Sequence, residues 1–319
     1  MTNEIKISNF SNEYIPQIVN IWNKNLPLDK TSVKNFVKMH ICDLNFDSSL
    51  FLLALKENRL IGFVFGIKRK YPHNTKGLET DTAWIKLVVV DNDSQKCGIG
   101  SLLLHELENR FSKLGTKNII LAMYSPSYIY SGIDKDNEAA VHFFEKYGYI
   151  RKEASYWMER NLEGFQIPTS VLQKKNLLMN EGFIFENYHD EIAYSLLSML
   201  INNFSTSWTG SVIDAIKNGK ATDTIIICRK ENLVVGYVSR ASIDNNQSRF
   251  GPFGVSSDFR NYKLGEILIN EMFKSMYEKG VYKVFFKSTE ENGKRFYLRN
   301  GMEVKRTFFK YEKHTLNSQ

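Results

Sequence analysis

The sequence predicts an α/β (α+β) protein made of two related domains in tandem, each a mixed, mostly antiparallel sheet flanked by helices. Three observations predict this class. The chain has 319 residues, of which 43% are hydrophobic and 24% charged, and a globular chain of this length usually divides into two cores of about 150 residues. Apolar residues alternate along short strand-like segments and recur at helical spacing between them. The same order of segments occurs twice, which indicates an internal repeat.

The first copy is expected to occupy residues 1–165. Apolar and β-branched runs predict its strands, and apolar residues three or four positions apart predict its helices. The expected elements are a strand at 5–10, helices at 12–22 and 31–42, strands at 51–56, 59–68 and 82–90, a helix at 98–113, a strand at 118–122, a helix at 138–147 and strand material to 162. Gly115 and Gly148 follow two of these helices as C-terminal breakers.

The second copy is expected at residues 176–319, after a linker at 166–175. Gly164 and Pro168 break the periodicity at the join, and apolar residues after Pro168 favour a helix within the linker. The expected elements are a strand at 183–188, helices at 191–202 and 211–218, strands at 224–229, 233–239 and 249–255, a helix at 264–279, a strand at 281–287 and a helix in RFYLRNGM. This last segment aligns with HFFEKYGY of the first copy.

Charge and cysteine content narrow the class of protein. The formal net charge of +7 favours anionic partners, which include phosphorylated cofactors as well as nucleic acids. The densest basic stretch, KRKYPHNTK at 68–76, is expected to be a solvated hairpin loop rather than a contact for phosphate or nucleic acid. Cys42, Cys97 and Cys228 lie far apart without a CxxC or HExxH pattern, so neither a disulfide nor a metal site is predicted.

The location expected from the sequence is the cytoplasm. No apolar run approaches the roughly 20 residues that a membrane helix needs. The N-terminal segment MTNEIKISNF also lacks the pattern of a signal peptide. We therefore expect a soluble protein with no membrane partner.

The segment LVVVDNDSQKCGIGSLLL, residues 87–104, is the most informative for function. A buried strand runs into a turn with Gly98 and Gly100 and then directly into an apolar helix. Such a turn lets a ligand approach the backbone, and the unpaired amides and positive dipole at the helix start favour an anion such as a pyrophosphate. A strand-to-helix turn that needs glycine only for its backbone geometry is the alternative. The segment matches neither GxxxxGK[ST] nor GxGxxG.

The six residues QKCGIG, at 95–100, resemble the [Q/R]xxGx[G/A] signature of the GCN5-related N-acetyltransferases, the GNAT family. NEAAVHFFEKYGY downstream resembles the next motif of that family. The second copy repeats the pattern as GPFGVSSDFRNYKLGEILI and GKRFYLRNGM, so the resemblance covers nearly the whole chain. It implies that acetyl-CoA is the co-substrate and that an amine-bearing acceptor is the second substrate.

The family's binding residues transfer to named positions in the first copy. The resemblance implies that the backbones of Val88, Val89 and Val90 pair with the pantetheine arm. It places Asn137, Ala140 and Phe144 at the thiol end. The residues expected around the pyrophosphate are Gln95, Lys96, Cys97, Gly98, Ile99, Gly100 and Ser101.

The mechanism implied is direct transfer, in which a neutral amine attacks the thioester and a backbone amide of the third strand stabilises the oxyanion. The family often uses a tyrosine to protonate the departing thiolate, and this chain has Phe144 at that position. Tyr147, Tyr128 and Tyr130 are alternative acids. Each of the three could instead serve in aromatic packing or as a wall of the substrate site. Tyr297 fills the tyrosine position in the second copy. Glu79 and Asp81, before the third strand, are the candidate bases, and solvated carboxylates are their competing role.

The second copy departs from the family pattern at its loop. Lys263 replaces the central glycine, and Glu290 falls where Asn137 would align. We therefore expect one CoA per chain, bound by the first domain. The function predicted is acetyl-CoA-dependent N-acetyl transfer to an unidentified acceptor. A non-catalytic acyl-CoA-binding sensor or interaction protein is the alternative, and nucleic-acid binding through the basic stretch ranks below both.

Overall fold

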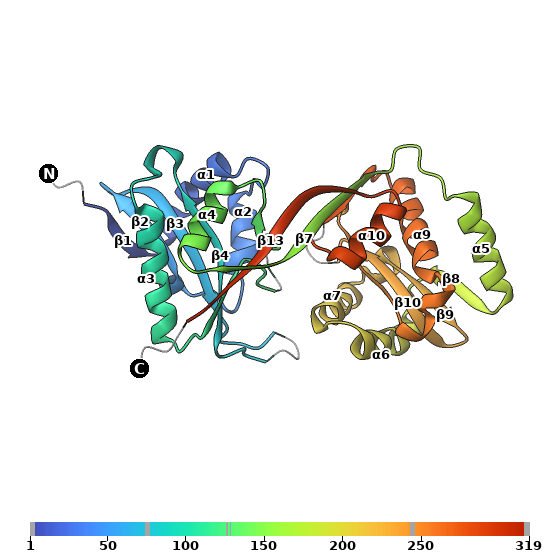
Figure 1. Ribbon diagram of the computed structural model, residues 1–319. Coiled ribbons are helices and arrows are strands. Elements are labelled where there is room, and N and C mark those ends of the chain that lie inside the picture. The colour runs from blue at the N-terminus through green and yellow to red at the C-terminus, as the bar shows by residue number, and fades with distance from the viewer. Residues whose placement is uncertain (1–3, 74–76, 126, 128, 243–245, 316–319) are drawn as a thin grey trace. The chain divides into compact units, whose positions relative to one another are not determined.

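The computed structural model describes residues 4–73, 77–125, 127, 129–242 and 246–315 (Figure 1). The chain divides into two compact units. Unit 1 contains the chain up to Ser155 together with the segment from Phe308 onward, and unit 2 contains Tyr156–Thr307. Both units are mixed α/β structures, which confirms the predicted fold class. In the described part of the chain, no helix is long and apolar enough to cross a membrane.

The helices and strands of unit 1 follow the predicted order closely. Its strands are β1 (Lys6–Asn9), β2 (Phe51–Lys56), β3 (Arg59–Lys68), β4 (Thr82–Val90), β5 (Asn118–Leu121) and β6 (Ile133–Asp134). Its helices are α1 (Ile15–Asn25), α2 (Val33–Phe36) with a π-helical extension (Val37–Ile41), α3 (Ile99–Lys113) and α4 (Glu138–Lys146). The sheet runs β1-β2-β3-β4-β5, and only the β4/β5 pair is parallel.

The last strand of each copy is shared between the units, which the sequence did not predict. β7 (Ile150–Asn161) leaves unit 1, and its final residues pair with β12 (Lys283–Phe286) in unit 2. β13 (Glu303–His314) leaves unit 2, and its end pairs with β5 and β6 in unit 1. Each copy therefore ends in a strand that pairs within the other unit. The expected linker, 166–175, overlaps helix α5 (Thr169–Asn180) within unit 2.

Helices cover both faces of the unit 1 sheet. On one face, Leu103, Leu107 and Phe111 of α3 pack with Val64 and Ile85. On the opposite face, the rings of Phe51, Phe63 and Phe65 contact one another, and Phe36 and His40 pack against them from the α2 side. This second face carries the polar groups described below.

A β-bulge in β4 changes which side chains face α3. Ile85 pairs with Gly66 and Leu87 pairs with Phe65, so Lys86 is an extra residue in the ladder. Because of this insertion, Ile85 and then Val88 contribute to the core under α3, three positions apart instead of two. Lys86 is thereby directed to the opposite face.

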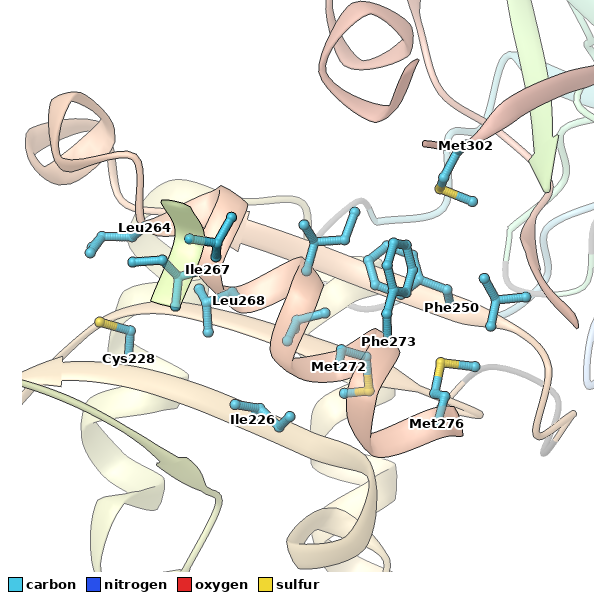
Figure 2. Close-up of a cluster of buried hydrophobic side chains, with 14 of the residues drawn as sticks. Ile226, Cys228, Phe250, Leu264, Ile267, Leu268, Met272, Phe273, Met276 and Met302 are labelled. Carbon is cyan, nitrogen blue, oxygen red and sulfur yellow. The ribbon is translucent and has the colours of Figure 1, made fainter. Parts of the chain in front are cut away.

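Unit 2 has a four-stranded antiparallel sheet in the order β11-β10-β9-β8. These strands are β8 (Phe183–Asn187), β9 (Ile225–Lys230), β10 (Leu233–Arg240) and β11 (Phe250–Val255). The helices are α6 (Ala193–Asn203), α7 (Thr206–Lys217), α8 (Ala221–Thr224), α9 (Leu264–Glu278) and α10 (Glu291–Arg299). Apolar side chains of α9 lie over Ile226 and Cys228 of β9 (Figure 2). Burial raises the pKa of the Cys228 thiol to about 12, so this cysteine is a packing residue.

Candidate active site

In unit 1, β4 and β5 run side by side and then separate, which opens one edge of β4. Their parallel pairing ends at Ile85 and Leu121, where the Ala122 amide donates to the Ile85 carbonyl at 2.8 Å. Ala122 and Met123 then adopt left-handed backbone angles, φ 56° and 54°, and leave the strand. β4 continues to Val90, and in the described residues this second half pairs with β3 only.

The hydrogen-bonding direction of β4 beyond the split follows from its pairing with β3. The Asp91 amide donates to the Ile61 carbonyl at 2.9 Å. Because successive residues direct their peptide groups to opposite edges, Val89 faces β3. Val88 and Val90 direct their N–H and C=O groups to the open edge. An extended ligand arm could pair with these groups as an added strand.

The loop after β4 is held by the side chain of Gln95. Its amide nitrogen donates to the Val90 carbonyl at 3.1 Å and to Oδ1 of Asn92 at 2.9 Å. Lys96 and Gly98 adopt left-handed angles, φ 60° and 79°, and the loop from Gln95 to Gly98 is exposed. Gln95 therefore fixes the loop beside the open edge of β4.

The loop ends at the N-terminus of α3, a helix of 15 residues. Gly98 is the N-cap residue, and its carbonyl accepts the first intrahelical bond, from the Leu102 amide at 3.0 Å. The amides of Ile99, Gly100 and Ser101 therefore have no acceptor within the helix. Together with the positive end of the helix dipole, they form a site suited to a phosphate. Cys97 lies exposed in the same loop.

Asn137 and Phe144 of the second motif have clear structural contacts. Asn137 caps α4, and its Oδ1 accepts a hydrogen bond from the Ala140 amide at 3.1 Å. Phe144 is buried in the core under α3, with its ring centroid 5.3 Å from that of Tyr149. These contacts account for both residue types through capping and packing, whatever further contact they make with a ligand.

The remaining part of α4 contacts the phosphate loop directly. The ring of Phe143 lies against Gly100, where an added Cβ would come within 3.4 Å of it. The Tyr147 hydroxyl donates to Oγ of Ser101 at 2.6 Å. Tyr147 is thus positioned at the first turn of α3, next to the expected pyrophosphate.

The other candidate tyrosines lie in different surroundings. Tyr130 is buried and stacks on Phe308 at a centroid distance of 5.8 Å, and Tyr128 lies outside the described residues. Tyr297, in unit 2, lies 4.4 Å from Phe286 between ring centroids, and burial raises the pKa of its hydroxyl. Tyr297 is partly buried and packs against the apolar core of unit 2.

A buried polar cluster lies where β4 and β5 separate. Lys86 is only 2% exposed, and its Nζ lies 3.1 Å from Nδ1 of His40 and 2.8 Å from Oγ of Ser127. Ser127 donates to Oδ2 of Asp43 at 3.0 Å, and the Tyr124 hydroxyl donates to Oδ1 of the same carboxylate at 3.2 Å. Lys86 was not among the site residues predicted from the sequence. Its signal was a single lysine inside the apolar run TAWIKLVVV.

A cavity of about 460 Å³ opens on the same face of unit 1. Trp84 and Ile120, a pair across the parallel β4/β5 ladder, form its apolar part. Its charged lining consists of three ion pairs, Arg69 with Glu79 at 2.8 Å, Lys152 with Glu312 at 2.7 Å and Lys310 with Glu153 at 2.9 Å. The cavity therefore presents both signs of charge beside an indole ring.

Arg69 is buried, which contradicts the predicted solvated loop at this residue. Its guanidinium carbon lies 4.9 Å from the ring centroids of both Trp84 and Tyr124, and its Nη2 donates to the Ser125 carbonyl at 3.1 Å. Stacking on two aromatic rings and pairing with Glu79 compensate the buried charge. Nη1 of Arg69 has no hydrogen-bond partner among the described residues.

The two candidate bases lie at different places. The Glu79 carboxylate lines the cavity and accepts from Nε of Arg69. Asp81 is exposed, and its carbonyl accepts from the Lys117 and Asn118 amides at the beginning of the β4/β5 pairing. Four residues separate Asp81 from Ile85, or about 13 Å of strand. Of the two, Glu79 lies in the cavity and Asp81 lies at the far end of the strand from the split.

The corresponding loop of unit 2 keeps the backbone but not the glycine. Lys263 is the N-cap residue of α9 and has φ 55°, the same left-handed region as Gly98. Glu290 is the N-cap residue of α10, and its side chain accepts no cap hydrogen bond. The repeat thus preserves the turn while changing the side chains that surround it.

A family comparison decides the class of the protein. The model of the acetyltransferase (GNAT) family matches residues 15–149 and 192–302, which correspond to the two repeats. The chain belongs to the GNAT family. This match confirms the family resemblance that was recognised in the QKCGIG and NEAAVHFFEKYGY motifs. No curated protein matches the sequence.

Several solved GNAT structures share the fold. A GNAT protein from Sphaerobacter thermophilus has 15% identity and a TM-score of 0.73, with 97% of this chain and 95% of that one covered. A tandem GNAT protein from the clavulanic acid biosynthesis pathway has 14% identity and a TM-score of 0.64, with coverage of 99% and 100%. The glucosamine N-acetyltransferase region of a fungal multi-domain β-N-acetylglucosaminidase has 16% identity and a TM-score of 0.75. That match covers 98% of this chain, which spans 38% of the fungal protein.

Proposed function

We propose that unit 1 is an acetyl-CoA-dependent N-acetyltransferase that transfers the acetyl group directly to an acceptor amine. The observation that carries this proposal is the open edge of β4 leading into the free amides at the start of α3. Membership of the GNAT family supports acetyl transfer as the general activity. The geometry of unit 1 supports its use as the site.

The fit of acetyl-CoA to unit 1 rests on space and on hydrogen-bonding groups. At Gly98 an added Cβ would meet no heavy atom within 4 Å, so the loop is open on that side. We assign the pyrophosphate to the amides of 99–101, with Lys96 exposed beside them. We assign the pantetheine arm to the peptide groups of Val88 and Val90. This path places the thioester near the split between β4 and β5.

In the proposed reaction the acceptor nitrogen attacks the thioester carbonyl, a C–N bond forms, the C–S bond breaks and CoA leaves as its thiolate. The chain supplies orientation along β4 and a backbone N–H at the split for the developing oxyanion. No protein nucleophile is required, so Cys97 has no covalent role. Phe144 is buried and has no proton to donate, so it takes no part in acid catalysis.

We assign the acceptor to the cavity lined by Trp84 and the three ion pairs. Its Trp84–Ile120 pair lies immediately before the Ile85–Leu121 pair at which the strands separate. A cavity of this size, lined by charges of both signs, suits a small amine that also carries an anionic group such as a carboxylate. Glu79 then serves to hold Arg69 in place.

The test is CoA release from acetyl-CoA with a panel of amines, half of which carry a carboxylate. We expect sustained release with at least one carboxylate-bearing amine, and none without acceptor. Tight acetyl-CoA binding without turnover across the panel would instead support the acyl-CoA sensor. Failure to bind acetyl-CoA at millimolar concentration would refute both.

A further inference from the structure

Lys86 is placed where a proton acceptor for the reaction would be needed. It is the bulged residue of β4 and follows Ile85, whose carbonyl accepts the last hydrogen bond of the β4/β5 ladder. Bulges redirect a side chain relative to its strand, and here the bulge turns Lys86 away from α3. A lysine that is almost completely buried requires an explanation, because burial disfavours its charged form.

The groups that face Lys86 come from three parts of unit 1: the π-helical extension with the turn after it, β3, and the segment after β5. His40 approaches from the π-helical extension of α2, and Ser127 from the segment after β5. The rings of Phe65 and Tyr124 lie 4.8 and 5.1 Å from its Nζ. The carboxylate whose charge acts on Lys86 is that of Asp43, which reaches the cluster through the Ser127 hydroxyl. A lysine kept for charge pairing would contact the carboxylate directly.

The hydrogen bonds around Nζ suit a neutral amine. Its two N–H groups can donate to Nδ1 of His40 and to Oγ of Ser127, and Ser127 passes its own hydrogen to Asp43. One lone pair of the nitrogen is then left to accept a proton. Burial lowers the pKa of Lys86 to about 7, and the charge of Asp43 opposes this shift in part. A base with that affinity exchanges protons near neutral pH.

Lys86 also lies next to the proposed acceptor cavity. Trp84 lines the cavity and is two residues before Lys86 on the same strand, or about 7 Å along it. The buried ring of Tyr124 contacts both cations, with Arg69 at 4.9 Å and Lys86 at 5.1 Å from its centroid. Lys86 does not itself line the cavity, so the proton transfer proposed below runs through water from an acceptor amine that lies toward the split.

We propose that Lys86 is the general base that removes a proton from the acceptor ammonium group before attack on the thioester. This role rests on the function proposed for unit 1. The proton moves from the acceptor nitrogen to Nζ, and the Asp43 carboxylate stabilises the resulting lysinium through Ser127. After attack the nitrogen of the tetrahedral intermediate loses a second proton, which the departing thiolate takes up as the C–S bond breaks. The lysinium then releases the first proton to solvent, so the cycle yields the amide, CoA thiol and one free proton without a further reactant.

The test compares wild type, Lys86→Met and Lys86→Arg, with Lys68→Met as the matched control on the neighbouring strand. We measure kcat/KM from pH 5.5 to 9.5 with the most active amine of the panel, and acetyl-CoA affinity by calorimetry. Lys86→Met and Lys86→Arg should lose roughly 100-fold or more of kcat, with acetyl-CoA affinity changed less than about threefold. The acidic limb of the wild-type profile should vanish in both variants, and Lys68→Met should retain it.

An intact acidic limb in Lys86→Met, or a loss of activity below about threefold, would overturn the role. A second measurement covers the case in which these variants do not fold. In wild type labelled with ¹³C at the lysine ε carbon, we expect one lysine to titrate near pH 7, the value to which burial lowers the pKa of Lys86. Titration of every lysine above pH 9 would refute the assignment even if no acceptor were found. Absence of turnover in wild type, with this titration present, would instead refute the proposed function.

Discussion

Replacing Gly98 by lysine tests which copy binds the cofactor, because it installs in unit 1 the residue that unit 2 has at Lys263. Both positions are the N-cap of a 15-residue helix and have left-handed backbone angles, φ 79° and 55°. An added Cβ at Gly98 meets no heavy atom within 4 Å. The cost to folding is therefore that of a non-glycine residue in the left-handed region, about 1–2 kcal/mol. The variant should fold.

The cost to binding should be larger. A lysine side chain at Gly98 would cover the amides that we assign to the pyrophosphate. Hydrogen bonds to a charged group contribute about 1.5–3 kcal/mol each, so loss of one weakens acetyl-CoA binding roughly 10- to 100-fold. Calorimetry should show one site in wild type, a much weaker site in Gly98→Lys, and an unchanged first site in Lys263→Gly. Gly98→Ala is the matched control, since it has the same backbone cost without the long side chain.

The result that would refute this reasoning is a folded Gly98→Lys variant that binds acetyl-CoA as tightly as wild type. Circular dichroism establishes the fold independently of binding. In that case the second copy would hold the cofactor, and Tyr297 would become the candidate acid, as the sequence comparison of the two copies allows. Loss of binding in Gly98→Ala as well would show that the backbone angle, and not the covered amides, controls affinity.

Three further predictions follow from single contacts in unit 1. Burial lowers the pKa of Lys86, so above pH 7 the folded chain releases a proton that the unfolded chain still holds. The free energy of unfolding should therefore rise with pH. Between pH 7 and 8.5 we expect this rise to be roughly 2 kcal/mol larger in wild type than in Lys86→Met. Urea unfolding measures this difference, and equal slopes would contradict it. Arg69→Lys should raise KM about tenfold for amines that carry a carboxylate and leave other amines unaffected, because one planar donor pair is lost; an equal change for both classes would argue against anion recognition. Tyr147→Phe removes the hydrogen bond to Ser101 and should weaken acetyl-CoA binding by less than tenfold with kcat unchanged, whereas a large fall in kcat alone would identify Tyr147 as the acid.

Local sequence patterns predicted the elements and the loop well. The alternation in 51–56 and 59–68 and the apolar run at 82–90 match β2, β3 and β4 within a residue, because strand periodicity and burial are properties of neighbouring positions. The glycine-bearing turn and the helix start at 98–99 were predicted for the same reason. The left-handed angle at Gly98 follows from the residue type itself.

The sequence could not predict features set by distant contacts. Arg69 belongs to a basic stretch, and only the rings of Trp84 and Tyr124 with Glu79 make its burial possible. The bulge at Lys86 is defined by register against β3, which periodicity within β4 does not reveal. The exchange of final strands likewise depends on which sheet edge β7 and β13 meet, and this is a contact between residues far apart in the sequence. A single charged residue within an apolar strand, such as Lys86 in TAWIKLVVV, is therefore a candidate site residue that can be recognised from the sequence.

The two glycines of the loop signature have different structural roles, and the comparison of the copies separates them. The second glycine is retained in both, because an added Cβ at Gly100 would come within 3.4 Å of the Phe143 ring and one at Gly265 within 3.1 Å of Phe253. Close packing of the helix accounts for this position without any ligand. The first glycine faces open space at Gly98, and unit 2 keeps the same backbone angle with Lys263 at its conformational cost. The fold therefore requires a left-handed turn at this position, but it does not require the residue there to be glycine. The left-handed angle by itself favours glycine at Gly98 by about 1–2 kcal/mol, and the open space beside Gly98 is where we assign the pyrophosphate in unit 1.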